Sequence, residues 1–270
     1  MALIAMLLAG IHAAAWAQEP HTEDEEANSS AIGFRPGSVN SWFFLSFLRD
    51  EGDDASTYGL ELENYVSMGS LEIKNISYFE VNQYPRAVPG QPHGNPEPGT
   101  EAADGINDLI SGFWFSKKSG HHGKHHFAPG LATMFPTASD KTLGSEKWGM
   151  GPSFDYEFES DKLFMGAIAL QIWSYAGNPD RKDVNMLMVK PFVYYSITEK
   201  WDLIYVPYGV SVYWNKPAGE KVYFPLGGGA QRSFKLSSLK LNLSGQFFKN
   251  VVRPTKGTVY DLRFLVGLEF

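Results

Sequence analysis

The sequence contains no cysteine in its 270 residues. Disulfides, thiolate metal ligands and a cysteine nucleophile are therefore excluded. After the N-terminal segment there is no run of about 18 apolar residues, so the sequence offers no transmembrane helix. The net charge of −7 comes without a basic stripe, which argues against nucleic acid as a partner. Helical periodicity is also missing after residue 38, which leaves an all-β fold as the prediction.

The N-terminal segment has the pattern of an export signal. Residues 2–15 form a short apolar run, and Ala15-Trp16-Ala17 matches a small-x-small cleavage site. We therefore predict a signal peptide over residues 1–17, with a buried N-terminal helix as the alternative. Residues 18–38 are acidic at their start, and we predict a periplasmic tail or a plug in the lumen. Residues 39–270 are predicted to form the folded domain.

An alternation of apolar and polar residues with period two replaces the helical pattern and is clearest at the C-terminus. From Tyr260 to Phe270 every second residue is apolar, and Asp261, Arg263 and Glu269 lie on the opposite face. Aromatic residues at both ends of an apolar stripe suit a strand that faces lipid, because rings favour the two membrane interfaces. The terminal Phe270 also resembles the signal read by the bacterial barrel-insertion machinery, which is therefore an expected partner.

The same alternation predicts about twelve strands and a closed antiparallel transmembrane β-barrel in the outer membrane of a Gram-negative bacterium. Closure is required because lipid cannot satisfy the free edge of a sheet. The expected strands span residues 39–50, 56–67, 70–81, 105–117, 125–136, 147–159, 162–175, 184–197, 200–214, 221–234, 238–249 and 258–270.

The connections between these strands alternate in length, as they do in such barrels. Tight turns are expected at residues 67–69, 160–162, 198–200 and 236–238. Longer or more polar connections are expected at residues 50–55, 82–104, 138–146, 177–183, 215–220 and 253–257. This pattern predicts that both termini are periplasmic and that the longer loops face outward, towards lipopolysaccharide.

Five short stretches in the second half of the chain occur in a distinctive order and spacing. They are residues 104–109 (DGINDL), 129–137 (from PG to FPT), 143–152 (from LG to KWGMGP), 224–229 (FPLGGG) and 248–254 (FKNVVRP). Through these stretches the chain resembles a bacterial family of outer-membrane transporters, whose members are usually labelled phenol-degradation meta-pathway proteins, some with a neuromedin-U label. One departure is Asn107, where the family is expected to have glycine. The resemblance implies passage of small, hydrophobic or aromatic molecules and supplies no catalytic residues.

Charged residues on the inward faces of the predicted strands are candidates to line a pore. Charged rings of this kind tune which solutes pass. The alternative is that these residues pair with one another and fill a narrow lumen, because twelve strands lie between the filled eight-stranded barrels and the open porins. The candidates are Glu61, Glu63, Asp155, Glu157, Lys190, Lys240 and Arg263.

Two further features bear on function. The histidines His121, His122, His125 and His126 are a weak candidate metal site, because no carboxylate or thiol near them in sequence would complete the shell. Pro191, Pro207 and Pro225 fall inside predicted strands, where each should break the ladder and could open the wall sideways for apolar solutes.

The sequence thus predicts a channel or transporter for small molecules, with no cofactor and no enzyme activity. Two alternatives stay open. One is an outer-membrane lipid-modifying enzyme, although no His-x-Ser sequence occurs in the chain. The other is a barrel that conducts nothing and has a structural or surface-binding role.

Overall fold

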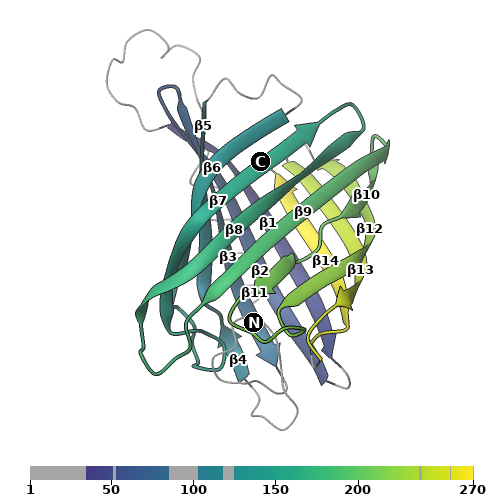
Figure 1. Cartoon of the computed structure of the whole chain (residues 1–270). Helices are drawn as coiled ribbons and strands as arrows, with labels where there is room; N and C mark the ends of the chain where they lie inside the picture. The colour runs from purple at the N-terminus through teal and green to yellow at the C-terminus, as the bar shows by residue number, and fades with distance from the viewer. Residues whose placement is uncertain are drawn as a thin grey trace.

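The computed structural model describes residues 35–50, 53–84, 103–117, 125–236, 239–255 and 257–269. For residues 35–50 and 53–55 it describes the backbone alone. These parts of the chain contain one antiparallel sheet and no helix (Figure 1). No helix in the described ranges is long and apolar enough to cross a membrane. The predicted signal peptide, most of the predicted tail, most of the 82–104 connection and Phe270 lie outside the described residues.

The sheet consists of fourteen strands, numbered in the order in which they occur along the chain. Their lengths fit a membrane, since β7 has 13 residues and β8 has 15, more than the roughly 9–11 that a tilted strand needs to cross the hydrocarbon. The strands are β1 (Arg35–Asp50), β2 (Asp53–Met68), β3 (Leu71–Tyr84), β4 (Ala103–Ile106), β5 (Leu109–Lys117), β6 (His125–Phe135), β7 (Lys147–Glu159), β8 (Leu163–Gly177), β9 (Asn185–Thr198), β10 (Trp201–Tyr205), β11 (Val210–Tyr213), β12 (Val222–Leu236), β13 (Leu239–Val252) and β14 (Tyr260–Glu269).

The fourteen strands occupy twelve positions in a closed wall. β4 and β5 both pair with β3, so they are two pieces of one position. β10 and β11 both pair with β9 and with β12, so they form a second divided position. β1 pairs with β14 from Asn40↔Glu269 to Arg49↔Tyr260, which closes the sheet. The prediction of a closed antiparallel barrel of about twelve strands is confirmed.

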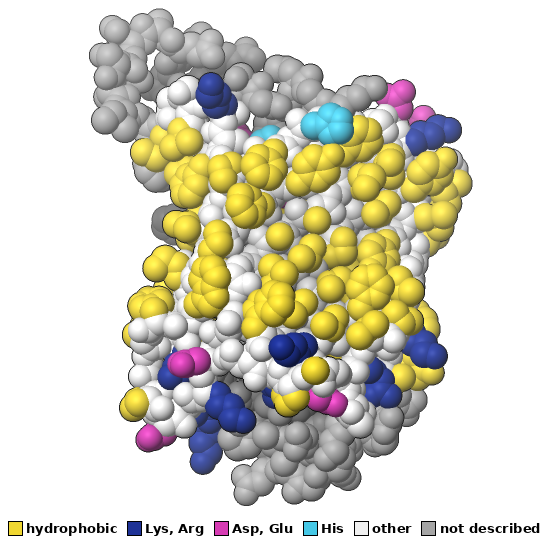
Figure 2. Space-filling view, viewed as in Figure 1, with side chains coloured by type: hydrophobic (Ala, Val, Ile, Leu, Met, Phe, Trp, Pro, Cys, Tyr) yellow, Lys and Arg dark blue, Asp and Glu magenta, His cyan; other side chains and the backbone are white. Residues whose placement is uncertain are grey.

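The outer face of the wall is a belt of apolar side chains, visible in Figure 2 as a hydrophobic band between two ends that carry the charged residues. Its exposed members include Phe127, Phe154, Leu203, Phe247 and Phe264, each at least 46% exposed. Soluble proteins rarely leave so large a contiguous apolar surface uncovered, and a lipid-facing barrel requires one. The wall therefore spans a membrane.

The two ends of the barrel differ in their connections. The register places the described N-terminal and C-terminal strand ends at one end of the wall, together with the tight turn at Gly69, where φ is 63°. The opposite end carries the longer connections at residues 136–146, 178–184, 214–221 and 253–259. The prediction of a longer connection at residues 50–55 is wrong. Asp50 pairs directly with Asp53, so β1 and β2 stay paired up to these two residues. Which end faces the periplasm stays a prediction.

Much of the barrel interior is filled by a packed apolar core. Trp114 is fully buried at its centre and donates a 2.9 Å hydrogen bond from Nε1 to Ser153 Oγ. Gly112 leaves room for the indole, since a Cβ there would lie 2.3 Å from the Trp114 ring. The core consists of Ile76, Tyr78, Ile110, Trp114, Ala128, Ala132, Met134, Ile168, Leu170, Ile172, Val184, Met186 and Met188, which come from β3, β5, β6, β8 and β9 and from the segment before β9.

Candidate transport site

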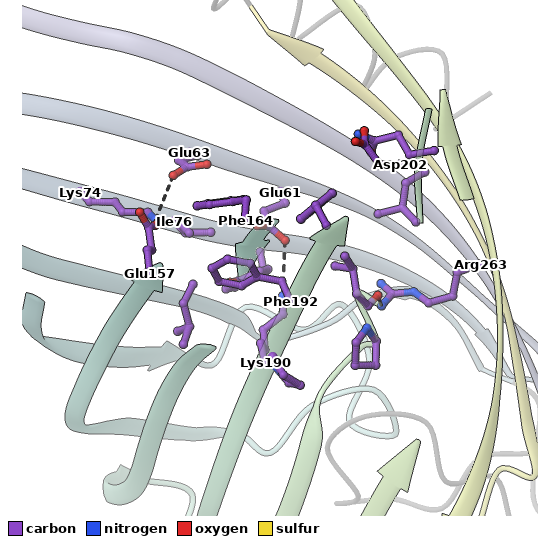
Figure 3. Close-up of a pocket in the computed structure, with 18 of the residues that line it drawn as sticks. Glu61, Glu63, Lys74, Ile76, Glu157, Phe164, Lys190, Phe192, Asp202 and Arg263 are labelled. Atoms are coloured by element: carbon purple, nitrogen blue, oxygen red, sulfur yellow. Dashed lines mark hydrogen bonds and ion pairs between the residues drawn. The ribbon is translucent and has the colours of Figure 1, made fainter. Parts of the chain in front are cut away.

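A cavity of about 480 Å³ lies inside the barrel, beside the packed core. Figure 3 shows most of the charged side chains of its wall in three groups, Lys74 with Glu63 and Glu157, Lys190 with Glu61, and Arg263 further along, while Asp202 stands apart from them. Aromatic rings of Phe164 and Phe192 stand between these groups. The volume falls within the roughly 300–1,000 Å³ usual for small-molecule sites.

The first group is built around Lys74 on β3. The alternation of side chains along this strand turns Lys74 inward. Its ammonium lies 2.7 Å from Glu157 Oε1, 2.9 Å from Asp155 Oδ2 and 3.2 Å from Glu63 Oε1. The Tyr65 hydroxyl donates a further 2.7 Å hydrogen bond to Glu63. Three carboxylates thus surround one ammonium, which donates hydrogen bonds to Asp155 and Glu157 and forms an ion pair with Glu63.

The second group crosses the barrel. Lys190 Nζ lies 3.4 Å from Glu61 Oε2 and 3.7 Å from the centre of the Tyr78 ring. Glu61 is on β2 and Lys190 on β9, which are six positions apart in the twelve-position wall. The contact therefore spans the lumen from one side to the other, and an extended solute moving straight along the axis must break it.

A second crossing comes from the break between β10 and β11, at residues 206–209. The Tyr208 hydroxyl donates a 2.8 Å hydrogen bond to Glu80 Oε1 on β3, again on the opposite side of the wall. At the base of the break, Val206 N–H donates to Gln246 Oε1 at 2.8 Å, and Arg263 Nη1 donates to the Val206 carbonyl at 3.0 Å. These bonds hold the segment inside the barrel and away from the ladder.

The same break interrupts the wall between β9 and β12. β9 pairs with β10 up to Val193↔Tyr205 and with β11 from Val189↔Val210, so residues 190–192 have no partner on that side. β12 pairs with Ile204 at Gly229 and with Ser211 at Tyr223, so residues 224–228 also have none there. Pro191 and Pro225 suit these stretches, because proline has no N–H to leave unpaired.

The cavity extends to this interruption. Pro191 and Phe192 from β9, together with Val206 and Pro207 from the break, belong to its wall. One side chain partly bridges the interruption, since the Tyr205 hydroxyl donates a 2.9 Å hydrogen bond to the Pro225 carbonyl. The interior space and the weakened part of the wall are therefore continuous.

The charged residues singled out in the sequence gather around one space. Glu61, Glu63, Glu157, Lys190, Lys240 and Arg263 all line the cavity. Asp155 lies behind them, fully buried and bonded to Lys74. The bonds from Lys74 and Lys190 to the carboxylates agree with the alternative that these residues pair with one another. Their role in selecting solutes stays a prediction.

Sequence reasoning missed Lys74, Tyr78, Glu80 and Tyr208. Lys74 had a usable signal, since Glu72 and Lys74 share one face of the strand predicted over residues 70–81. Tyr208 had none, because its inward position depends on the break that moves residues 206–209 out of the ladder.

The histidine cluster is divided between two faces of the wall. His121 and His122 lie outside the described residues. His125 is exposed on the outer face, with Nδ1 2.9 Å from the Tyr156 hydroxyl and its ring against Phe158. His126 follows it on β6 and pairs in register with Glu157, whose side chain points inward. In the described ranges no three metal-ligating side chains gather, and the metal hypothesis stays untested.

Similar structures place the fold among outer-membrane barrels. No protein-family model matches the chain, and no curated protein matches its sequence. An outer membrane channel of the COG4313 type from Pseudomonas putida F1 is similar over 93% of this chain and 100% of that chain, with 9% identity and a TM-score of 0.59. The translocator domain of the autotransporter NalP from Neisseria meningitidis is more distant, with 11% identity, coverage of 89% of both chains and a TM-score of 0.31. A TodX monoaromatic hydrocarbon channel variant gives 10% identity, coverage of 86% and 88%, and a TM-score of 0.34.

The lipid-facing belt, the closed wall and the P. putida similarity define the class of protein. The chain is a transmembrane β-barrel of the outer-membrane type. Its interior is partly filled, and the space that remains adjoins an interruption in the wall.

Proposed function

We propose that the protein is a channel that carries small apolar or aromatic molecules through the outer membrane and releases them sideways through the wall. The observation that carries this proposal is the interruption between β9 and β12, next to the cavity. In this account both termini are periplasmic, and the longer loops receive solute from outside the cell.

The filled interior supports a sideways route. The core around Trp114 occupies the space beside β5–β9, and two contacts, Glu61–Lys190 and Glu80–Tyr208, cross the rest of the lumen. A straight path would have to break charged and polar contacts in a medium where their loss is costly. A path through the wall meets the apolar side chains of Pro191 and Phe192 and then lipid, which suits an apolar solute.

The nature of the solute follows from the cavity wall and from the family resemblance. The resemblance to the phenol-degradation family and the aromatic rings of Phe164, Phe192 and Tyr194 in the cavity wall both favour aromatic molecules. Aromatic faces stack with other rings at a gain of about 0.5–1.5 kcal/mol beyond the burial of area.

The test is uptake of a neutral aromatic solute into lipid vesicles that contain the full chain. Pro191→Trp places a bulky side chain at the interruption on β9. Ala169→Trp is the matched control, because Ala169 also faces outward but lies on the neighbouring β8, where the ladder is intact. We expect wild type and Ala169→Trp to take up 2-phenylethanol faster than empty vesicles, and Pro191→Trp to lose most of that gain. Equal uptake by both variants would contradict the sideways route.

A barrel that conducts nothing is the second candidate, because the two crossings and the packed core also fit a permanently closed lumen. It predicts that vesicles with wild-type protein take up the solute no faster than empty vesicles. The same measurement therefore decides between the two functions.

A further inference from the structure

The Lys74 end of the cavity holds more negative than positive charge. Among the described side chains, Glu63, Asp155 and Glu157 face the Lys74 ammonium, and Lys240 adds a second cation to the cavity wall, so three carboxylates meet two cations. The other two cations of the wall have acidic partners, because Lys190 is matched by Glu61 and Arg263 by Asp261 at 3.8 Å. Charge held away from water is costly unless it is compensated, so this end favours an additional cation.

One carboxylate oxygen at this end also lacks a partner. Asp155 is fully buried, its Oδ2 accepts from Lys74, and its Oδ1 has no hydrogen-bond donor among the described residues. Lys74 donates its hydrogen bonds to Asp155 Oδ2 and Glu157 Oε1 and forms an ion pair with Glu63. Asp155 lies behind the cavity wall and therefore adds negative charge next to the cavity that is only partly compensated.

The rest of the cavity wall is suited to the body of an organic cation. The chain itself shows that an ammonium is accepted here, since Lys190 Nζ lies 3.7 Å over the Tyr78 ring. Tyr78 lines the cavity and is 8% exposed, and its hydroxyl has no hydrogen-bond partner among the described residues. Phe164 and Phe192 add further ring faces, which attract cations and stack with aromatic groups.

We propose that the cavity binds a small aromatic ammonium, with its charged nitrogen beside Glu63 and Glu157 and its ring between Phe164 and Phe192. This inference rests on the proposed channel function, because it names the class of solute that the cavity holds longest. A neutral aromatic molecule of the same shape uses the rings alone and binds more weakly.

The test compares two probes that differ in one group, phenethylamine and 2-phenylethanol. Their binding to the full chain in a neutral detergent is measured by calorimetry, with empty micelles subtracted. We expect the amine to bind about tenfold more tightly, as for one hydrogen bond to a charged group. In Glu63→Gln/Glu157→Gln, which removes the excess charge, that preference should disappear while 2-phenylethanol binds as before.

Two further variants keep the test decisive. Glu159→Gln, on the same strand but exposed at its end, should retain the full preference for the amine. Folding of each variant is checked by retained heat-modifiable migration on gels. Glu157→Gln alone should give an intermediate preference, and it replaces the double variant if that variant does not fold.

Equal binding of the two probes by the wild type, or an unchanged preference in the double variant, would overturn this inference. The channel proposal would survive that result if vesicles still took up 2-phenylethanol. If vesicles took up neither probe, the channel proposal itself would fail.

Discussion

Tyr208 and Glu80 are 128 residues apart in the sequence and meet in a 2.8 Å hydrogen bond across the lumen. The bond links the break between β10 and β11 to the opposite wall. It also lies beside a small pocket of about 20 Å³ that Tyr78 and Lys190 share with the main cavity. The contact is therefore placed to control access from the end that carries the longer loops.

Removing the Tyr208 hydroxyl should loosen this contact. In Tyr208→Phe, the 206–209 segment loses one of the three hydrogen bonds that hold it inside the barrel, at a cost of about 1 kcal/mol. We expect faster uptake of 2-phenylethanol into vesicles and little change in overall stability. Tyr175→Phe, on the exposed outer face, is the control and should behave as wild type. Slower uptake by Tyr208→Phe would show that the hydroxyl assists passage instead of limiting it.

Reversing the charge of Arg263 should alter ion selectivity. Arg263 is buried, lies 3.8 Å from Asp261 and donates to the Val206 carbonyl. Arg263→Glu puts two acids side by side and removes an anchor of the break, so planar-bilayer recordings should show larger and more cation-selective currents. Arg263→Lys keeps the charge and should change selectivity little. An unchanged reversal potential in Arg263→Glu would mean that ions do not pass this part of the lumen.

Trp114 should dominate the stability of the filled half of the barrel. Trp114→Ala removes a fully buried indole and leaves Ser153 without its donor, which should lower the free energy of unfolding by about 3–5 kcal/mol. Phe127→Ala, at a lipid-facing position that is 60% exposed, should cost clearly less. Urea unfolding in micelles, followed by tryptophan fluorescence, gives both values. Similar losses for the two variants would argue against a tightly packed interior.

The loop at residues 214–221 and the loop at residues 253–259 should separate in acid. The Thr255 hydroxyl and backbone N–H both donate to the Glu220 carboxylate and hold its pKa below the usual range. A carboxyl with a lowered pKa contributes its stabilisation above its ordinary pKa and loses it as the pH falls through the lowered value. The protection factor of the Thr255 amide, which compares its exchange with the intrinsic rate at the same pH, should therefore fall in acid in the wild type. In Glu220→Gln the protection factor should be low already at neutral pH, and a high protection factor that does not change with pH in either protein would contradict the link.

The sequence predicts the wall well because a lipid-facing strand needs strict alternation. Tyr260 to Leu268 shows this pattern, and β14 places those residues outward as expected. The inward face carries no comparable rule, since a packed core, an ion pair and a water-filled pore all tolerate varied residues. Trp114 and Met134 thus look the same in sequence whether they face lipid or the core.

The candidate site was predictable in part for the same reason. Alternation alone turned Glu61, Glu157 and Lys190 inward, but it does not say which of them meet across the barrel. That depends on closure and on the shift of register, which place β2 opposite β9. The prolines at positions 191, 207 and 225 marked the interruption, and the inward course of residues 206–209 emerged only from the structure.

The most direct test of the sideways route is a diffraction structure of the protein soaked with a brominated aromatic solute, whose bromine is located by anomalous scattering. The account predicts bromine in the cavity beside Phe192 and at the interruption beside Pro191, with the Glu61–Lys190 and Glu80–Tyr208 contacts both intact. Bromine along the barrel axis at the level of Lys74, with the Glu61–Lys190 contact broken, would show a straight path and contradict the account.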